Sequence, residues 1–123
     1  QIIDMQRKKT GKLFNFCCYA TGVIAGKNEK EKKNLSLLGE DIGLLFQLAD
    51  DFLDIKGTKE NTGKVIGKDS KKEKSTLIRL MGYKKTYIYA NKIKINILRK
   101  LKKYGKKADN LKETINFILG RNF

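Results

Sequence analysis

The stretch that decides the fold reads GLLFQLADDFLDI and occupies residues 43–55. Its four polar side chains lie at relative positions 0, 3, 4 and 7, which is the spacing of one face of an α-helix. The other positions are apolar nearly all round, so the pattern predicts a largely buried helix with one narrow polar stripe. The stripe consists of Gln47, Asp50, Asp51 and Asp54.

Acidic side chains that converge in a partly buried place repel one another and need compensation. Mg²⁺ is a suitable partner, because it prefers carboxylate oxygens and commonly shares them with substrate phosphates. One alternative is a solvated acidic face. Another is a set of acidic charges at a helix N-terminus, but the expected helix, about residues 34–55, places these aspartates near its C-terminal end. We therefore expect a magnesium–diphosphate site.

The composition favours one compact, all-α domain. The chain has 123 residues, and it has no proline, which fits long uninterrupted helices. No apolar run approaches the ~18 residues that a membrane span needs. The first residues carry no signal-peptide pattern and do not begin with Met. We expect a cytoplasmic protein and a sequence that starts inside something longer.

The net charge of +15 raises the possibility of a nucleic-acid-binding module. Only four of the 28 basic residues are arginines, and the lysines are spread along the chain, so a solvated lysine-rich surface is the preferred interpretation. The adjacent Cys17 and Cys18 are poorly placed to bridge each other, and we expect two small buried apolar residues in a reducing compartment. The absence of histidine excludes a His-based catalytic triad.

Hydrophobic periodicity and glycine placement predict five helices and no strand. Gly82 and Gly105 are expected to end two of them, and Asn110 with Glu113 resembles a capping box at the start of the last. Residues 27–33 are expected to form a charged connector, and residues 56–74 a long glycine- and lysine-rich loop. The expected helices span about residues 1–26, 34–55, 75–81, 84–104 and 110–119.

Lysines accompany the stripe in three segments that could neutralise a metal-bound diphosphate. Lys9 precedes Thr10 on the first helix, Lys64 lies in NTGKVIGKD, and Lys74 follows in EKST. Any one of these lysines alone would be read as an ordinary surface residue. The information lies in their combination with the FQ pair and the DDxxD pattern.

That combination resembles the trans-type isoprenyl diphosphate synthases, most closely the bacterial short-chain farnesyl and geranylgeranyl diphosphate synthases. The matching segments are KKTGKLFNFCC at 8–18, GLLFQLADDFLD at 43–54, GKVIGKD at 63–69 and KST at 74–76. The resemblance implies an isoprenoid-synthase-type helical bundle and a homodimer. It also implies a magnesium-dependent prenyltransferase that condenses isopentenyl diphosphate with an allylic diphosphate.

The resemblance assigns roles to individual positions. Asp50 would bind Mg²⁺ directly, and Asp51 and Asp54 would support the metal and its water shell. The backbone carbonyl of Thr10 and the side chain of Gln47 would face the allylic cation. The remaining expected contacts are Lys9 and Lys64 to the allylic diphosphate, Phe46 to the isopentenyl diphosphate site, and Lys74 in a substrate-binding loop.

The family's first aspartate-rich motif, which lies well upstream of the second, has no counterpart here. The resemblance therefore implies that residues 1–123 are the C-terminal half of a single prenyl diphosphate synthase domain and that this half alone is inactive. The alternative is a non-catalytic subunit that resembles the synthases and acts by binding a partner.

Overall fold

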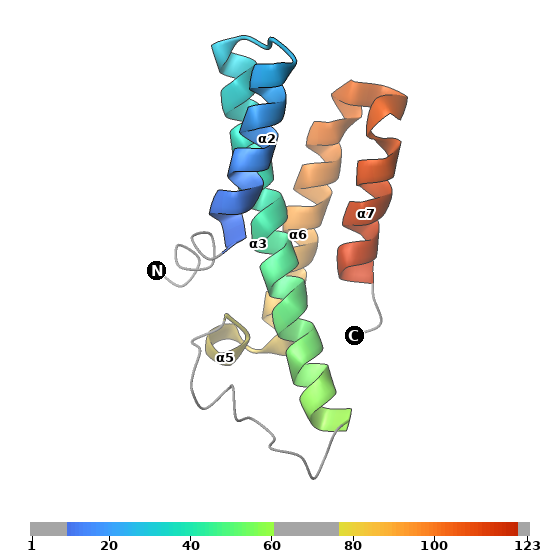
Figure 1. Cartoon of the computed structure of the whole chain (residues 1–123). Coiled ribbons are helices and arrows are strands. Elements are labelled where there is room, and N and C mark those ends of the chain that lie inside the picture. Colours follow the sequence, from blue (N-terminus) through green and yellow to red (C-terminus); the bar gives the residue numbers. More distant parts are fainter. Residues whose placement is uncertain (1–9, 61–76, 121–123) are drawn as a thin grey trace.

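The computed structural model describes residues 10–60 and 77–120, and every element in those ranges is helical. The elements are α2 (Lys12–Ile24), α3 (Glu29–Glu60), α5 (Leu77–Met81), α6 (Tyr83–Leu101), the 3₁₀ segment η2 (Lys102–Ala108) and α7 (Asp109–Gly120). The all-α prediction is confirmed for this part of the chain. Successive long helices run in opposite directions (Figure 1).

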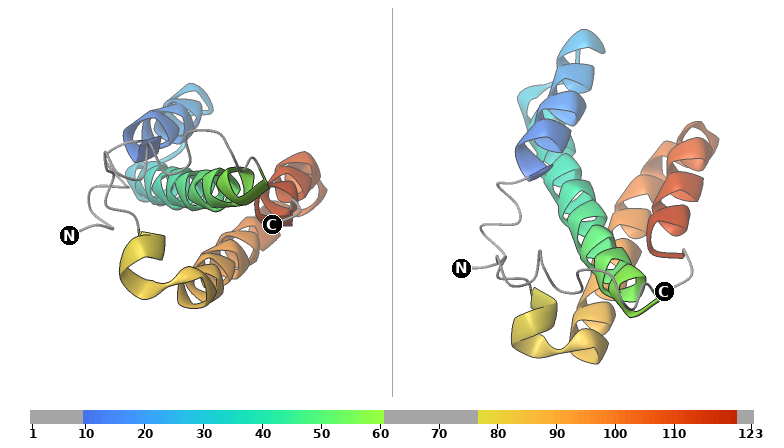
Figure 2. Two further views of the ribbon diagram at one scale, coloured as in Figure 1. Left: turned by 90° about the horizontal axis from the view of Figure 1, so that it is seen from below. Right: turned by 60° about the horizontal axis from the view of Figure 1, so that its bottom comes forward.

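The long helix α3 organises the others, as the sequence pattern of residues 43–55 predicted. It packs against α2, α6, α7 and α5, and it lies between α2 on one side and the α6–α7 pair on the other (Figure 2). Its apolar positions Leu44, Leu45, Leu48 and Phe52 are fully buried. They meet the fully buried side chains of α6 and α7, namely Ile97, Leu101, Ile115 and Leu119.

Two predicted boundaries of α3 were wrong. Residues 29–33 of the segment expected as a charged connector already belong to the helix, because the Asn28 side chain accepts a hydrogen bond of 2.8 Å from the backbone N–H of Glu31. Glu29 and Glu31 then place negative charge in the first turn, where the helix dipole favours it. At the other end the helix continues to Glu60 through residues expected as loop. Residues 61–74 of that expected loop lie outside the described ranges.

Glycines mark the ends of elements where the backbone turns. Gly26 follows α2 with φ of 70°, and Gly82 separates α5 from α6 with φ of 89°. Gly105, with φ of 60°, interrupts the helical path after Tyr104 as expected, although the last turn, from Lys102, is 3₁₀ rather than α. The expected capping box was wrong, since α7 begins at Asp109 and Asn110 lies inside it.

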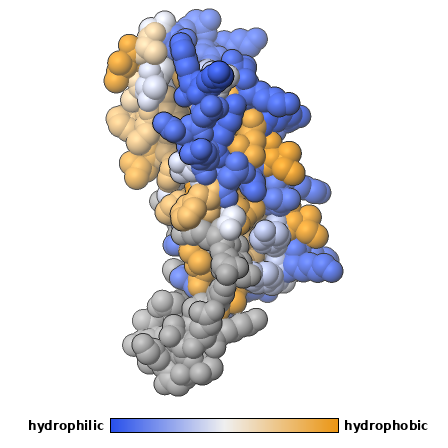
Figure 3. All heavy atoms as spheres, turned by 90° about the vertical axis from the view of Figure 1, so that its right-hand side faces the viewer, coloured by the Kyte–Doolittle hydropathy of each residue, from blue (hydrophilic) through white to orange (hydrophobic). Residues whose placement is uncertain are grey.

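The outer side of α2 is apolar and exposed. Leu13, Phe16, Val23 and Ile24 are all exposed, and Figure 3 shows apolar side chains along the upper left edge, where α2 lies. The prediction that both cysteines are buried was wrong for Cys17, which is exposed. Cys18 is half-buried, and this burial raises the pKa of its thiol. The lysines conform to the expected solvated surface, and none of those within residues 10–55 and 77–120 is buried.

Candidate functional site

The polar stripe is present on α3, and its members differ in exposure. Asp50 and Asp54 are exposed, Gln47 is half-buried, and only 6% of Asp51 is accessible to solvent. The stripe therefore runs along the border between the core and solvent, with the fully buried Phe52 next to it in sequence. Because α3 continues to Glu60, the aspartates lie inside the helix rather than close to its C-terminal end. The alternative of acidic charges at a helix N-terminus is excluded, because α3 begins at Glu29, many turns before Asp50.

Thr10 and Gln47, which the sequence placed together, are in direct contact. The Thr10 hydroxyl donates a hydrogen bond of 3.0 Å to Gln47 Oε1. Gln47 Nε2 in turn donates to Asp51 Oδ1 at 3.2 Å. These two hydrogen bonds connect Thr10, which lies just before the start of α2, with the buried Asp51 of α3. It fixes the orientation of the Gln47 amide, because its oxygen and its nitrogen each have a partner.

The geometry of the hairpin formed by α2 and α3 explains this contact. Asn15 Nδ2 donates to Glu40 Oε2 at 2.6 Å, two helical turns before Gln47 on α3. Since the helices are antiparallel, the Asn15–Glu40 pair and the Thr10–Gln47 pair lie along one seam between them. The two contacts set the register of the hairpin.

An aromatic pair that the sequence analysis missed lies beside this seam. The rings of Phe14 and Phe46 are 5.9 Å apart at an interplanar angle of 40°. Phe46 is 39% exposed, so the pair borders solvent on the stripe side of α3. The available signal was the four-residue spacing of Thr10 and Phe14, which places both on one helix face.

The metal-ligand prediction can be compared with the donor set that the side chains offer. In residues 10–60 and 77–120 no three Asp, Glu, Cys or His side chains form a cluster that could hold a metal ion. The stripe instead offers two exposed carboxylates, Asp50 and Asp54, one helical turn apart. Mg²⁺ typically binds through one or two carboxylates plus waters and substrate phosphates, so this donor set fits a metal that arrives with a diphosphate. Predicted contacts Lys9, Lys64 and Lys74 lie outside the described residues.

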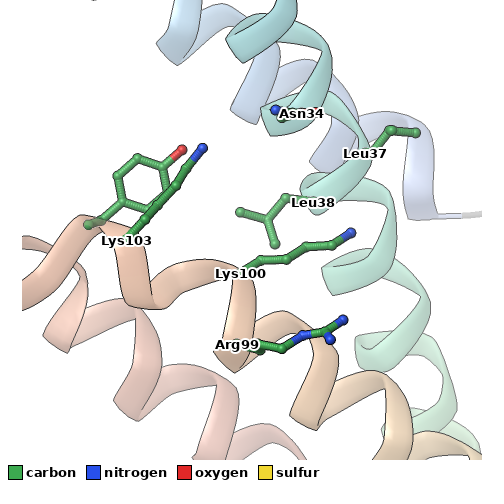
Figure 4. A pocket seen from close by; sticks show the side chains of 7 residues that line it. Asn34, Leu37, Leu38, Arg99, Lys100 and Lys103 are labelled. Atoms are coloured by element: carbon green, nitrogen blue, oxygen red, sulfur yellow. The ribbon is translucent and has the colours of Figure 1, made fainter.

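The cavity in Figure 4 is separate from the stripe. It has a volume of about 400 Å³ and lies where α3 meets the end of α6 and η2, with Leu38 at its wall. Leu38 lies twelve residues before Asp50 on α3, about 18 Å along the axis. Two of its lining cations pair with carboxylates of α3, Lys100 with Asp41 at 3.4 Å and Lys103 with Glu31 at 2.9 Å. These ion pairs connect α3 with α6 and with η2.

The chain is similar to known proteins over most of its length. The polyprenyl synthetase family model matches residues 1–118. The chain is 35% identical over 114 residues to a farnesyl diphosphate synthase of Micrococcus luteus, with 93% of this chain and 39% of that protein covered. It is 34% identical over 113 residues to a dimethylallyltranstransferase of Fischerella ambigua, with 92% and 33% covered.

A geranylgeranyl diphosphate synthase of Cyanophora paradoxa is 33% identical over 114 residues, with 93% of this chain and 38% of that protein covered. The chain thus spans between a third and two fifths of the length of these relatives. No helix in the described part of the chain is long and apolar enough to cross a membrane. With the family model matched over residues 1–118 and the FQ–DDxxD stripe in place on a buried helix, this chain belongs to the polyprenyl synthetase family.

Proposed function

We propose that this chain provides one face of the active site of a magnesium-dependent trans-prenyltransferase, which condenses isopentenyl diphosphate with an allylic diphosphate. The product is proposed to be farnesyl diphosphate or geranylgeranyl diphosphate, because the relatives carry those names. The observation that supports the proposal best is the hydrogen-bond chain from Thr10 through Gln47 to Asp51. It joins two sequence patterns that are 37 residues apart in the chain.

The chemistry assigned to this face is ionisation of the allylic diphosphate. Mg²⁺ bound at the stripe would neutralise charge on the departing diphosphate. The Asp50 and Asp54 carboxylates are exposed on the stripe, where a substrate-borne ion can reach them, whereas Asp51 is buried and accepts a hydrogen bond from Gln47. The lysines Lys9, Lys64 and Lys74 are proposed to contact substrate, with Lys9 and Lys64 on the allylic diphosphate.

Gln47 and Thr10 are proposed to stabilise the developing allylic cation. The Gln47 amide dipole is held at both ends, so it would not have to reorganise as positive charge forms. Phe46, packed on Phe14, is proposed to border the site of the second substrate. The apolar rings would help to keep water away from a reactive cation.

The proposal is tested on the protein at its full encoded length, supplied with isopentenyl diphosphate, geranyl diphosphate and MgCl₂. We expect an elongated prenyl product, and we expect Asp50→Asn to lower the turnover by at least about 100-fold while the melting temperature stays close to that of the wild type. The matched control is Glu113→Gln, which neutralises an exposed acid on α7 and should leave turnover unchanged.

Two results would contradict the proposal. Elongation that proceeds equally well in Asp50→Asn would remove the metal role from the stripe. Failure of the wild-type protein to elongate any allylic diphosphate, together with capture of a second synthase-like chain, would favour the alternative of a non-catalytic subunit. The chain of residues 1–123 by itself is expected to give no turnover, and a homodimer is expected for the full-length protein.

A further inference from the structure

Gly43 lies at a close approach between α3 and Gly11, the residue that precedes α2, one helical turn after the still closer approach of Gly39 to the Phe14 backbone. A Cβ atom added to Gly43 would lie 2.9 Å from the Cα of Gly11 and 3.2 Å from the backbone nitrogen of Gly11. Both neighbours are backbone atoms, so neither can rotate away as a flexible side chain would. Gly43 and Gly11 are both buried. Any larger residue at position 43 must therefore push the two backbones apart.

This close approach lies directly beside the hydrogen-bond chain of the site. Gly43 precedes Gln47 by four residues and shares its face of α3, and Gly11 follows Thr10 in the chain. The Thr10–Gln47 hydrogen bond has a length of 3.0 Å. Because hydrogen bonds weaken beyond about 3.2–3.5 Å, a separation of roughly half an ångström would break this one.

Glycine is otherwise unfavourable at this position. In a helix interior it costs up to about 1 kcal/mol relative to alanine, and α3 gains no turn or cap from Gly43. The φ angle of Gly43 is not in the left-handed region, so backbone conformation gives no reason for glycine either. The remaining explanation is the space that it leaves for Gly11.

We propose that Gly43 is a positioning residue, which lets the backbone at Gly11 approach α3 closely enough that the Thr10 hydroxyl reaches Gln47 and holds its amide toward the reacting cation. The kinetic part of this inference rests on the proposed prenyltransferase function. The structural part, the dependence of the Thr10–Gln47 contact on Gly43, can be measured without turnover.

The kinetic test compares two alanine variants of the full-length protein. Gly43→Ala is expected to lower kcat by roughly 10- to 100-fold with little change in KM for the allylic diphosphate, because a displaced Gln47 stabilises the transition state less well. The matched control is Gly22→Ala on the same hairpin. Its Cβ would meet side-chain atoms, Leu35 Cδ1 at 3.0 Å and Lys32 Cγ at 3.1 Å, which can shift. It should keep wild-type kcat.

A double-mutant cycle separates positioning from general destabilisation. If Gly43 acts through Thr10, the loss of kcat caused by Gly43→Ala should largely disappear when it is measured in a Thr10→Val background. A general loss of folding would instead multiply the two effects. Full multiplicativity, or a Gly43→Ala variant with wild-type kcat, would overturn the proposal.

Nuclear Overhauser effects test the structural part independently. In the wild-type protein we expect contacts between the Hα protons of Gly11 and Gly43, and between the Thr10 methyl group and the Gln47 side-chain amide. Gly43→Ala should lose the second contact and Gly22→Ala should keep it. If Gly43→Ala does not fold, absence of the Gly11–Gly43 contact in the wild type would still refute the inference. If the wild type makes both contacts but no product, the enzymatic proposal fails and only the structural part of this inference stands.

Discussion

Thr10 Oγ1 donates a hydrogen bond of 3.0 Å to Gln47 Oε1, so a residue just before α2 directly contacts the polar stripe of α3. The contact is partly buried, and Gln47 Nε2 in turn donates a hydrogen bond to Asp51 Oδ1. It connects two of the segments that carry the family resemblance, residues 8–18 and 43–54.

Replacement of Thr10 by valine tests how much this contact stabilises the hairpin. Valine keeps the branched shape and removes the hydroxyl, so Gln47 Oε1 loses its donor. We expect a decrease of about 0.5–1.5 kcal/mol in the free energy of unfolding, measured by urea denaturation. Thr10→Ser keeps the hydroxyl and should lie closer to the wild type. Equal stability of all three proteins would show that the hydrogen bond contributes nothing measurable.

The two adjacent aspartates should respond differently to mutation. Asp51 is 6% exposed and accepts a hydrogen bond from Gln47, so Asp51→Ala leaves the half-buried Gln47 amide without its acceptor and should cost about 1–3 kcal/mol of stability. Asp50 is exposed, and Asp50→Ala should change the unfolding free energy by less than about 0.5 kcal/mol. Chemical denaturation of both variants measures the two changes in unfolding free energy. Equal decreases for Asp50→Ala and Asp51→Ala would mean that exposure does not distinguish the structural roles of these aspartates.

Phe52 is expected to be the most sensitive aromatic position of α3. It is fully buried, and the rings of Tyr83 and Tyr87 meet it edge-on at centroid distances of 5.0 and 5.7 Å. Phe52→Ala should lower the unfolding free energy by about 3–5 kcal/mol, because it removes core contacts and leaves a cavity. Phe16→Ala on the exposed side of α2 serves as the control, with an expected change below about 0.5 kcal/mol. If Phe16→Ala lowered the unfolding free energy more than Phe52→Ala does, this would contradict the exposure of Phe16 and the burial of Phe52.

The sequence predicted the all-α class and the central role of α3, because apolar residues repeat there with helical spacing over residues 43–55. It also placed Thr10 with Gln47, through the family resemblance rather than through periodicity. Helix ends were predicted less well. Asn28 extends α3 backward as a cap inside a charged segment, and periodicity does not detect a cap in a stretch without apolar residues.

Contacts between helices were beyond the sequence patterns. The Phe14–Phe46 pair and the close approach of Gly43 to Gly11 depend on the register of two helices, and hydrophobic periodicity describes one helix at a time. Exposure was also partly mispredicted. Cys17 is a small apolar residue that a composition argument buries, yet it lies on the outer side of α2.

The final prediction concerns the pH dependence of the contact between α3 and η2. Glu31 near the start of α3 accepts hydrogen bonds from the Tyr104 hydroxyl and from Lys103 Nζ, the latter at 2.9 Å. The Tyr104 hydrogen bond, followed by that of Lys103, lowers the pKa of Glu31. Burial, followed by the hydrogen bond to Glu31, raises the pKa of Tyr104.

These opposite shifts define a window in pH. A lowered carboxyl pKa contributes stability that is present above its unfolded value of about 4.3 and is lost as the pH falls through the folded value. A raised tyrosine pKa contributes stability that is present below its unfolded value of about 10 and is lost as the pH rises through the folded value. The stability difference between wild type and Glu31→Gln should therefore be largest between about pH 5 and pH 9 and should shrink on either side. Urea midpoints measured at several pH values give this difference. Glu113→Gln is the control for removal of an acidic charge, and a Glu31→Gln difference that stays constant from acid to neutral pH would show that the contact does not form in solution.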